Sequence, residues 1–431
     1  MGHLVQIIES GGVTQAIARE TDGSLTAVYD PRTPGKALVV DDAPQAKVER
    51  APIVVSESAR RLHAGALLID GHNDMPWEIR KQADSQFGRL DIATRQPTLQ
   101  TDIPKLRDGG VKAQFWSVWV PVDTMRRGTA LTTTLEQIDL VKRMVAAYPE
   151  TFATALTADD VERIAGEGKI ASLIGVEGGH SIENSLAVLN RLYDLGARYM
   201  TLTHSDTIEW ADSATDEAKH GGLTPFGEDV VREMNRLGML IDLSHVSPDV
   251  MKHALRITKA PVIFSHSSAR GVADHPRNVP DDVLPLVAQN GGVVMINFFS
   301  GFLVPEAAAR DVERMAFRRE IEASGADEGE RTTALARWDR EHPLPRGDVH
   351  TLLDHIDRVV RLAGVDHVGL GSDYDGVNVL PRQLEDASCY PVVTQGLLDR
   401  GYSEEQVRKI LGLNVLRALR AAEQVADRKT P

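Results

Sequence analysis

Seven histidine and acidic side chains follow apolar runs of the type that forms buried strands. They are His72, Asp74, Glu177, His204, His245, His266 and Asp373. Imidazoles and carboxylates are ligands of zinc and of similar divalent cations. The chain has a single cysteine, Cys389, which excludes a thiolate zinc ribbon and an intrachain disulfide framework. We therefore predict a metal site held by histidine and carboxylate side chains from several strand ends.

The first pair of these residues is spaced for joint binding of one cation. His72 and Asp74 are two residues apart at the end of the apolar run 67–69. Residues two apart in a strand project from the same face. An imidazole and a carboxylate placed in this way can bind the same ion.

Glu177 is suited to join two cations, because a carboxylate has two oxygen atoms. It is flanked by Gly175 and Gly178, which let the backbone come close to a bound group. Two cations held about 3.5–4 Å apart can polarise a carbonyl and lower the pKa of a shared water from 15.7 to about 7. Hydrolysis is the chemistry that this arrangement predicts, with Glu177 as a catalytic group.

Two further side chains are candidates for substrate contact. His72, His245 and His266 already supply imidazoles for two ions, so we assign His204 to the substrate or to its developing oxyanion. Arg277 lies on the loop expected after the sixth strand, and its planar guanidinium suits a substrate carboxylate.

A proton carrier is expected beside the metals. Asp373 ends the last expected strand and could take a proton from the attacking water and pass it to a leaving amine. Asp375, two residues later, is the alternative. We favour a different role for Asp375, in which it caps the following loop through an Asx turn.

The elements that would position these groups alternate between apolar runs and helical patterns, which indicates parallel βα units. Eight runs are expected to be strands: 66–71, 112–120, 171–177, 198–203, 239–244, 261–265, 292–298 and 367–372. Eight such units predict an α/β fold of the (β/α)₈ TIM-barrel type. Its active site lies at the carboxyl ends of the strands.

Two segments are expected to lie outside the barrel repeat. Residues 1–55 contain short β-prone runs at 4–8, 14–18, 25–29 and 37–40, separated by turn signals. We predict a small β meander there and a barrel over 56–431. The charged segment 301–348, between strands seven and eight, is expected to be a helical insertion that serves as a lid, a dimer arm or a solvated hairpin.

Composition limits the partners. The 431 residues include 48 basic and 62 acidic side chains, a net charge of −14, which argues against non-specific binding to nucleic acid or an anionic membrane. We find no signal segment, no apolar span of 18 residues and no hydrophobic tail. The expectations are therefore a cytoplasmic protein with no membrane anchor in this chain.

Six motifs in order resemble those of the membrane (renal) dipeptidase family of metallopeptidases. They are HNDMPW at 72–77, GVEGGH at 175–180, LTHS at 202–205, DLSHVS at 242–247, FSHSS at 264–268 and RNVPD at 277–281. The resemblance covers about residues 62–420. It implies a dizinc barrel that hydrolyses dipeptides and forms a homodimer.

The same resemblance implies a role for each site residue. His72 and Asp74 would hold one Zn²⁺, His245 and His266 the other, and Glu177 would bridge them. The substrate contacts would be His204, Arg277 and Asp373, with Asp373 as the proton carrier. Two alternatives stay open: a dizinc hydrolase for N-acyl amino acids, lactams or other cyclic amides, and a metal-binding barrel without catalysis.

Overall fold

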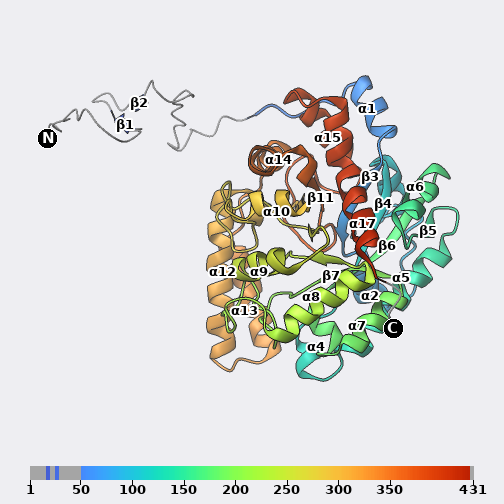
Figure 1. The fold of residues 1–431 in the computed structure, drawn as a ribbon, viewed down its shortest axis with the longest axis vertical. Coiled ribbons are helices and arrows are strands. Elements are labelled where there is room, and N and C mark those ends of the chain that lie inside the picture. The colour runs from blue at the N-terminus through green and yellow to red at the C-terminus, as the bar shows by residue number, and fades with distance from the viewer. Residues whose placement is uncertain (1–15, 20–24, 29–49, 428–431) are drawn as a thin grey trace. The chain divides into compact units, whose positions relative to one another are not determined.

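The computed structural model describes residues 16–19, 25–28 and 50–427, and the chain divides into two compact units, 1–51 and 52–431 (Figure 1). The first unit contains the strands β1 (Ala16–Arg19) and β2 (Leu25–Val28), which pair antiparallel. They match two of the four β-prone runs of the predicted meander. The other two runs, at 4–8 and 37–40, lie outside the described residues.

The second unit is built on a closed ring of eight parallel strands. In ring order these are β3 (Leu68–Asn73), β11 (Val368–Leu370), β10 (Val293–Ile296), β9 (Ile263–Phe264), β8 (Leu240–Asp242), β7 (Ala197–Thr201), β6 (Ile170–Glu177) and β4 (Val111–Trp119). The ring closes because β4 pairs with both β3 and β6. The predicted (β/α)₈ barrel is confirmed, and each expected strand overlaps an observed one.

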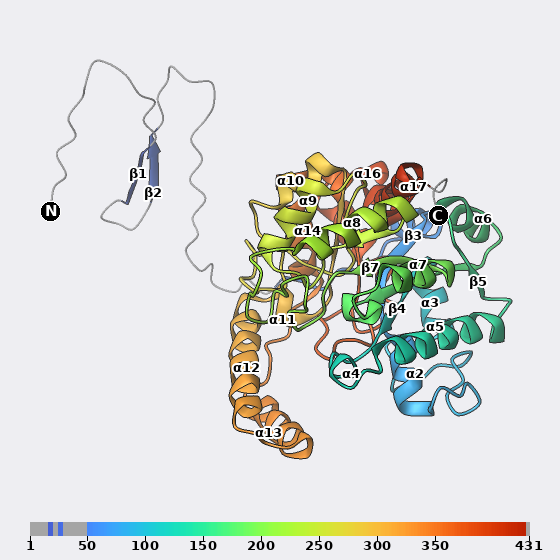
Figure 2. The same cartoon turned by 60° about the horizontal axis from the view of Figure 1, so that its bottom comes forward.

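Helices surround the ring (Figures 1 and 2). The α-helices are α1 (Glu57–Ala64), α2 (Met75–Ala83), α3 (Ile103–Asp108), α4 (Asp123–Arg126), α5 (Ala130–Ala147), α6 (Ala158–Gly166), α7 (Leu186–Asp194), α8 (Pro225–Leu237), α9 (Pro248–Ile257), α10 (Leu284–Asn290), α11 (Ser300–Leu303), α12 (Pro305–Ala323), α13 (Glu328–Glu341), α14 (Val349–Ala363), α15 (Tyr390–Asp399), α16 (Glu404–Arg408) and α17 (Asn414–Val425). Short 3₁₀ turns, η1 (Gly179–Ile182) and η2 (Val365–His367), and a π turn, η3 (Lys409–Leu413), complete the set. Among the described residues, no helix has the length and apolar character needed to cross a bilayer.

One strand of the second unit lies outside the ring and was not expected from the sequence. The three-residue strand β5 (Phe152–Thr154) pairs in parallel with the start of β6, from Phe152 opposite Ile170 to Thr154 opposite Ser172. Three residues are too few to show the alternation that marks a strand. Its pairing partner, rather than its own sequence, makes it a strand.

Polar side chains begin the helices that follow the strands. The Ser247 hydroxyl accepts a hydrogen bond from the Val250 N–H at the start of α9, and the Thr224 hydroxyl does the same for the Gly227 N–H in α8. Helix α8 ends at Gly238, whose φ of 79° is a conformation that glycine adopts readily. These caps fix where the helices that follow β7 and β8 begin.

The segment between β10 and α14 forms three helices, α11, α12 and α13, in the region of the expected insertion. Helices α12 and α13 pack on each other as a hairpin (Figure 2). The side chain of Arg319 in α12 donates to the Thr215 carbonyl, at an N···O distance of 3.2 Å, in the loop after β7. The insertion therefore touches a loop that leaves the site end of the barrel.

A buried histidine in α14 joins two other parts of this end of the barrel. His355 is fully buried; its Nδ1 accepts from the Ala269 N–H and its Nε2 donates to the Leu303 carbonyl, each at 3.0 Å. The contacts tie the loop after β9 to the end of α11. Burial lowers the pKa of His355 to about 4.

This pKa predicts acid destabilisation with a definite sign. Between pH 6.5 and 4 the unfolded chain binds a proton at His355 that the folded chain does not, so the free energy of unfolding falls as the pH falls. Urea unfolding of the wild type and of His355→Gln should show a difference between them that shrinks by about 2 kcal/mol from pH 7 to pH 4.5. A difference that does not change with pH would contradict the prediction.

Candidate metal centre

The predicted acids and imidazoles meet at the carboxyl ends of the barrel strands. His72 is in β3 and Glu177 ends β6, whereas His204, His245, His266 and Asp373 lie in the loops after β7, β8, β9 and β11. Three overlapping groups have ligand atoms within 4.8 Å of one another: His72, Glu177 and His266; Glu177, His204 and His245; and His72, Asp74 and Asp373. The structure thus places all five predicted metal ligands, together with His204 and Asp373, in one cluster.

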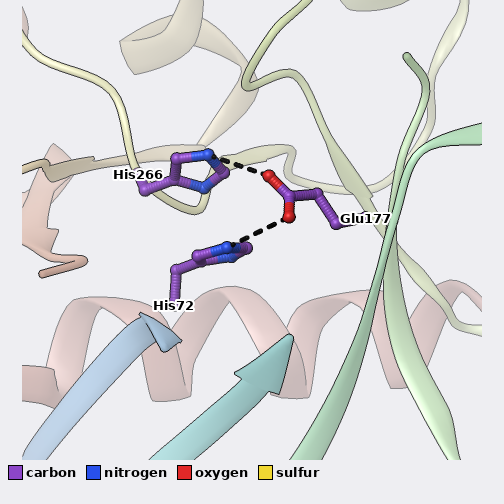
Figure 3. A group of neighbouring side chains, drawn as sticks. All are labelled: His72, Glu177 and His266. Carbon is purple, nitrogen blue, oxygen red and sulfur yellow. Dashed lines mark ion pairs between the residues drawn. The ribbon is translucent and has the colours of Figure 1, made fainter. Parts of the chain in front are cut away.

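Glu177 is the centre of this cluster, and its two oxygen atoms face different imidazoles. Oε1 lies 3.0 Å from His245 Nε2 and 3.3 Å from His266 Nε2. Oε2 lies 3.4 Å from His72 Nε2, and Figure 3 shows the carboxylate directed at both His72 and His266. Because one oxygen faces His245 and His266 and the other faces His72, this carboxylate is placed to bridge two cations.

The ring nitrogens of the clustered histidines are placed to bind a metal. His72 Nε2 is buried and has no hydrogen-bond partner in the described part of the chain, although Asp74 Oδ2 is 3.2 Å away. His245 Nε2 and His266 Nε2 lie only 2.9 Å apart. Nitrogen lone pairs that converge on buried space are the donor set that a divalent cation requires.

Backbone strain marks the same cluster. His245 and Asp373 have φ values of 69° and 62°, in the left-handed region that non-glycine residues rarely adopt. Such conformations cost about 1–3 kcal/mol and persist where the surrounding structure enforces them. Here they place the His245 imidazole beside Glu177 and the Asp373 carboxylate beside His72 and Asp74.

The charge states also suit cation binding. Burial lowers the pKa of His245 and of His266 well below the usual value, so both imidazoles are neutral and can bind a metal. Burial alone would raise the pKa of Glu177, but the nearby imidazoles of His72 and His204 outweigh it and hold that pKa well below its usual range. The carboxylate is therefore ionised beside the neutral imidazoles of His245 and His266. Burial alone would lower the pKa of His72, but nearby negative groups outweigh it and raise this pKa well above its usual value, so this imidazole must release a proton to bind a metal.

His204 is the most accessible imidazole of the cluster. Its side chain is 18% exposed, whereas that of His72 is fully buried, and its Nε2 lies 3.6 Å from Glu177 Oε1. Its ring packs on that of His245 with centroids 4.3 Å apart. Burial lowers the pKa of His204 to about 4, so it is neutral. This position allows contact with a substrate as well as with the cluster.

The cluster opens into a cavity of about 350 Å³, and Arg277 lines this cavity together with His204. Arg277 is 4% exposed, donates to Ser267 Oγ and to the His266 carbonyl at 3.3 Å, and stacks on Phe302 with Cζ 5.3 Å from the ring centre. Burial lowers its pKa to about 10, which leaves it charged at neutral pH. It has no carboxylate ion-pair partner among the described residues, so this cation is available to an anionic ligand.

Asp373 and Asp375 have different surroundings. Asp373 is buried, and its Oδ2 accepts from Asn297 Nδ2 at 2.7 Å. Burial, reinforced by the charge of Asp74, raises the pKa of Asp373 well above its usual value. Asp375 Oδ1 instead accepts from the Gln100 N–H at 2.7 Å, so its carboxylate fixes a loop distant in sequence rather than the one that follows it.

Sequence reasoning did not identify two residues that hold the cluster. The Tyr199 hydroxyl lies 2.8 Å from His72 Nδ1, and the Asn297 amide bonds to Asp373. Tyr199 lies in β7 and Asn297 follows β10, where alternation along the strands places side chains toward the barrel interior. Aromatic residues Trp77, Trp119 and Phe302 also line the cavity.

Gly175 in β6 makes room for Tyr199. A Cβ atom there would lie 1.9–2.4 Å from three carbons of the Tyr199 ring. We expect Gly175→Ala to lower the free energy of unfolding by about 1–3 kcal/mol, the usual cost of overpacking. Because the ring must move, its hydroxyl would also leave His72, and metal binding should weaken.

Gly166→Ala is the matched control for thermal unfolding and metal titration. Gly166 ends α6, and a Cβ atom there would meet nothing within 4 Å beyond the backbone of its own helix. Alanine there should leave the metal titration unchanged and raise the free energy of unfolding by about 0.5–1 kcal/mol, because alanine favours a helix over glycine. Equal behaviour of the two variants would show that the Gly175 position does not support Tyr199.

Comparison with known proteins gives a consistent family. The family model described as "Membrane dipeptidase (Peptidase family M19)" matches residues 56–430. "Dipeptidase 3" of Mus musculus is 41% identical over 378 residues, covering 86% of this chain and 68% of the mouse protein. "Dipeptidase 3" of Rattus norvegicus is 41% identical over 379 residues, with the same coverage.

Solved structures share the fold. The probable dipeptidase PvdM from Pseudomonas aeruginosa superposes with a TM-score of 0.74 at 24% identity, covering 86% of this chain and 98% of the other. A metallo peptidase from Rhodobacter sphaeroides, liganded with a phosphinate mimic of the dipeptide L-Ala-D-Ala, gives 0.69 at 23% identity, covering 83% and 99%. The chain therefore belongs to the membrane dipeptidase family, peptidase family M19, and is a metallo-dipeptidase.

Proposed function

We propose that the chain is a zinc-dependent dipeptidase that holds two Zn²⁺ ions. His72 and Asp74 would hold one ion, His245 and His266 the other, and Glu177 would bridge them. When bound, the ions would polarise the scissile carbonyl and lower the pKa of water to about 7. One observation supports this proposal above all. Oε1 of Glu177 faces His245 and His266, whereas Oε2 faces His72.

The residues around the cluster would orient the dipeptide. The guanidinium of Arg277 would bind the C-terminal carboxylate, since it is buried, charged and lacks a carboxylate partner in the described residues. His204, with its exposed edge beside Glu177, would donate to the carbonyl oxygen as negative charge develops there.

Asp373 would move the proton. The hydrogen bond from Asn297 holds its carboxyl group beside His72 and Asp74. Its raised pKa would let this group receive a proton and deliver it to the leaving amine. The cavity also contacts Trp77 and Trp119, which would exclude water from the reacting bond.

A substrate panel tests this function. Zn²⁺-loaded protein would be assayed with dipeptides that carry either an L- or a D-residue at the second position, with N-acyl amino acids and with β-lactams. The D-series belongs in the panel because the Rhodobacter sphaeroides relative is liganded with a mimic of L-Ala-D-Ala. Hydrolysis confined to N-acyl amino acids or lactams would favour the alternative amidohydrolase; no metal-dependent turnover of any compound would favour a non-catalytic barrel.

Arg277→Gln gives a prediction specific to the carboxylate. Hydrogen bonds to charged groups are worth about 1.5–3 kcal/mol, so KM for a dipeptide should rise by roughly 10- to 150-fold with little change in kcat. The same dipeptide with a C-terminal amide is the control, because it lacks the charge that Arg277 binds. An equal rise in KM for the amide would show that Arg277 has another role.

We also propose that the chain forms a homodimer and is located in the cytoplasm. A homodimer would appear in light scattering of the purified chain as twice the mass of 47.1 kDa. A cytoplasmic location would appear in cell fractionation.

A further inference from the structure

Two buried aspartates in the barrel have the same hydrogen bonds at two places in the ring. Asp242, at the end of β8, accepts through Oδ1 from the backbone N–H groups of Ser244 and Ser265, at 3.0 and 2.8 Å. Its Oδ2 accepts from the hydroxyls of Ser265 and Thr201, each at 2.6 Å. All four bonds stabilise a carboxylate that is completely buried.

Asp70 in β3 is the counterpart. Its Oδ1 accepts from the backbone N–H groups of His72 and Ser372, at 3.3 and 2.8 Å. Its Oδ2 accepts from the hydroxyls of Ser372 and Tyr390, at 2.6 and 2.7 Å. Each aspartate thus joins its own strand to the neighbouring strand through one serine.

The two serines differ in what lies on their other side. Ser265 Oγ is 2.8 Å from His266 Nδ1, an imidazole of the metal cluster. Ser372 Oγ is 3.4 Å from the His72 carbonyl, a backbone group, and the His72 ring bonds to Tyr199 instead. Of the two hydrogen-bond networks, that of Asp242 and that of Asp70, only the Asp242 network therefore contacts the ring of a candidate metal ligand.

The direction of the bonds follows from the acceptor. An ionised carboxylate can only accept, so the Ser265 hydroxyl proton points at Asp242 Oδ2. The oxygen of Ser265 then accepts from His266 Nδ1, which must carry the ring proton. His266 Nε2 is left with its lone pair toward Glu177 and His245, the tautomer that binds a metal.

The neighbouring ligand lacks such a contact. His245 Nδ1 is buried without a hydrogen-bond partner among the described residues. Of the two imidazoles assigned to this ion, only His266 has its tautomer and ring orientation fixed by a hydrogen bond.

We propose that Asp242 is a positioning residue for the metal centre and acts on His266 through Ser265. The inference rests on the proposed function, since it assumes that His266 binds Zn²⁺. Partners of this kind hold a ligand ring in place and increase its basicity, and their loss typically weakens metal binding by about 10- to 100-fold.

Because the two networks have matching hydrogen bonds, variants of the Asp70 network serve as controls for variants of the Asp242 network. Zn²⁺ affinity of the full chain would be measured by competition with a chromophoric chelator for Ser265→Ala and Asp242→Asn, and for the counterparts Ser372→Ala and Asp70→Asn. Circular dichroism and thermal unfolding would report the fold of each variant. Visible absorption of the Co²⁺-loaded proteins would report the ligand geometry.

We expect Ser265→Ala and Asp242→Asn to weaken one of the two Zn²⁺ ions by about 10- to 100-fold and to change the Co²⁺ spectrum. Ser372→Ala and Asp70→Asn should match the wild type in both measurements, even if they unfold at a lower temperature. Equal losses of Zn²⁺ affinity in the variants of both networks, or no loss in either, would overturn the proposal. A wild-type protein that binds no Zn²⁺ would instead refute the proposed function.

Discussion

Replacing Glu177 by glutamine is expected to remove metal-dependent hydrolysis almost completely. The amide keeps the shape of the side chain but loses the charge, and an amide nitrogen would face one of the imidazole groups now served by Oε1 and Oε2. Metal ions supply several kcal/mol of transition-state stabilisation, and about 4 kcal/mol corresponds to roughly a 10³-fold loss of kcat/KM. Bound Zn²⁺ should fall from two ions per chain to one or none.

Glu78→Gln is the control for this variant. Glu78 lines the same cavity but belongs to none of the three ligand groups. Its replacement should leave the Zn²⁺ content unchanged when measured by elemental analysis of the dialysed protein. Two retained ions and a near wild-type rate in Glu177→Gln would show that this carboxylate does not bridge the metals.

Asp373→Asn is expected to lower kcat by about 10²- to 10⁴-fold, the usual contribution of a general acid or base, while Zn²⁺ remains bound. Asparagine tolerates positive φ, so the backbone at φ 62° can persist. The amide cannot carry the proton from the attacking water to the leaving amine. Steady-state kinetics and elemental analysis on one preparation give both results.

Asp375→Asn is a close match, because Asp375 lines the same cavity and has φ 67°. Its contact with the Gln100 N–H needs only an acceptor, which asparagine retains. It should hydrolyse dipeptides at close to the wild-type rate. If Asp373→Asn keeps both its metals and its wild-type rate, Asp373 is not the proton carrier; if it loses metal, Asp373 is a ligand.

The barrel could be predicted because many of the ring strands lie in apolar runs that are followed by a polar residue, as at β8, β9 and β10. Strands buried on both faces lose alternation but gain this contrast, as at 171–177, where the run ends in Glu177. Strand β5 has three residues and no such contrast. It depends on its pairing with β6, which sequence does not show.

The candidate ligands could be predicted for the same reason, since parallel strands bring their carboxyl ends together. The supporting contacts could not, because they join residues distant in sequence. Tyr199 reaches His72 across 127 positions, and Asn297 reaches Asp373 across 76. Nothing in the sequence distinguishes Asp70 from Asp242; only the structure shows that the serine beside Asp242 contacts a ligand ring.

Anomalous diffraction at the zinc edge, from crystals of the Zn²⁺-loaded protein, would show directly whether Glu177 bridges two ions. We expect two peaks about 3.5–4 Å apart, one on each side of the Glu177 carboxylate. The first should be next to His72 and Asp74, and the second next to His245 and His266. A single peak, or two peaks that Glu177 does not join, would contradict the bridged two-metal centre.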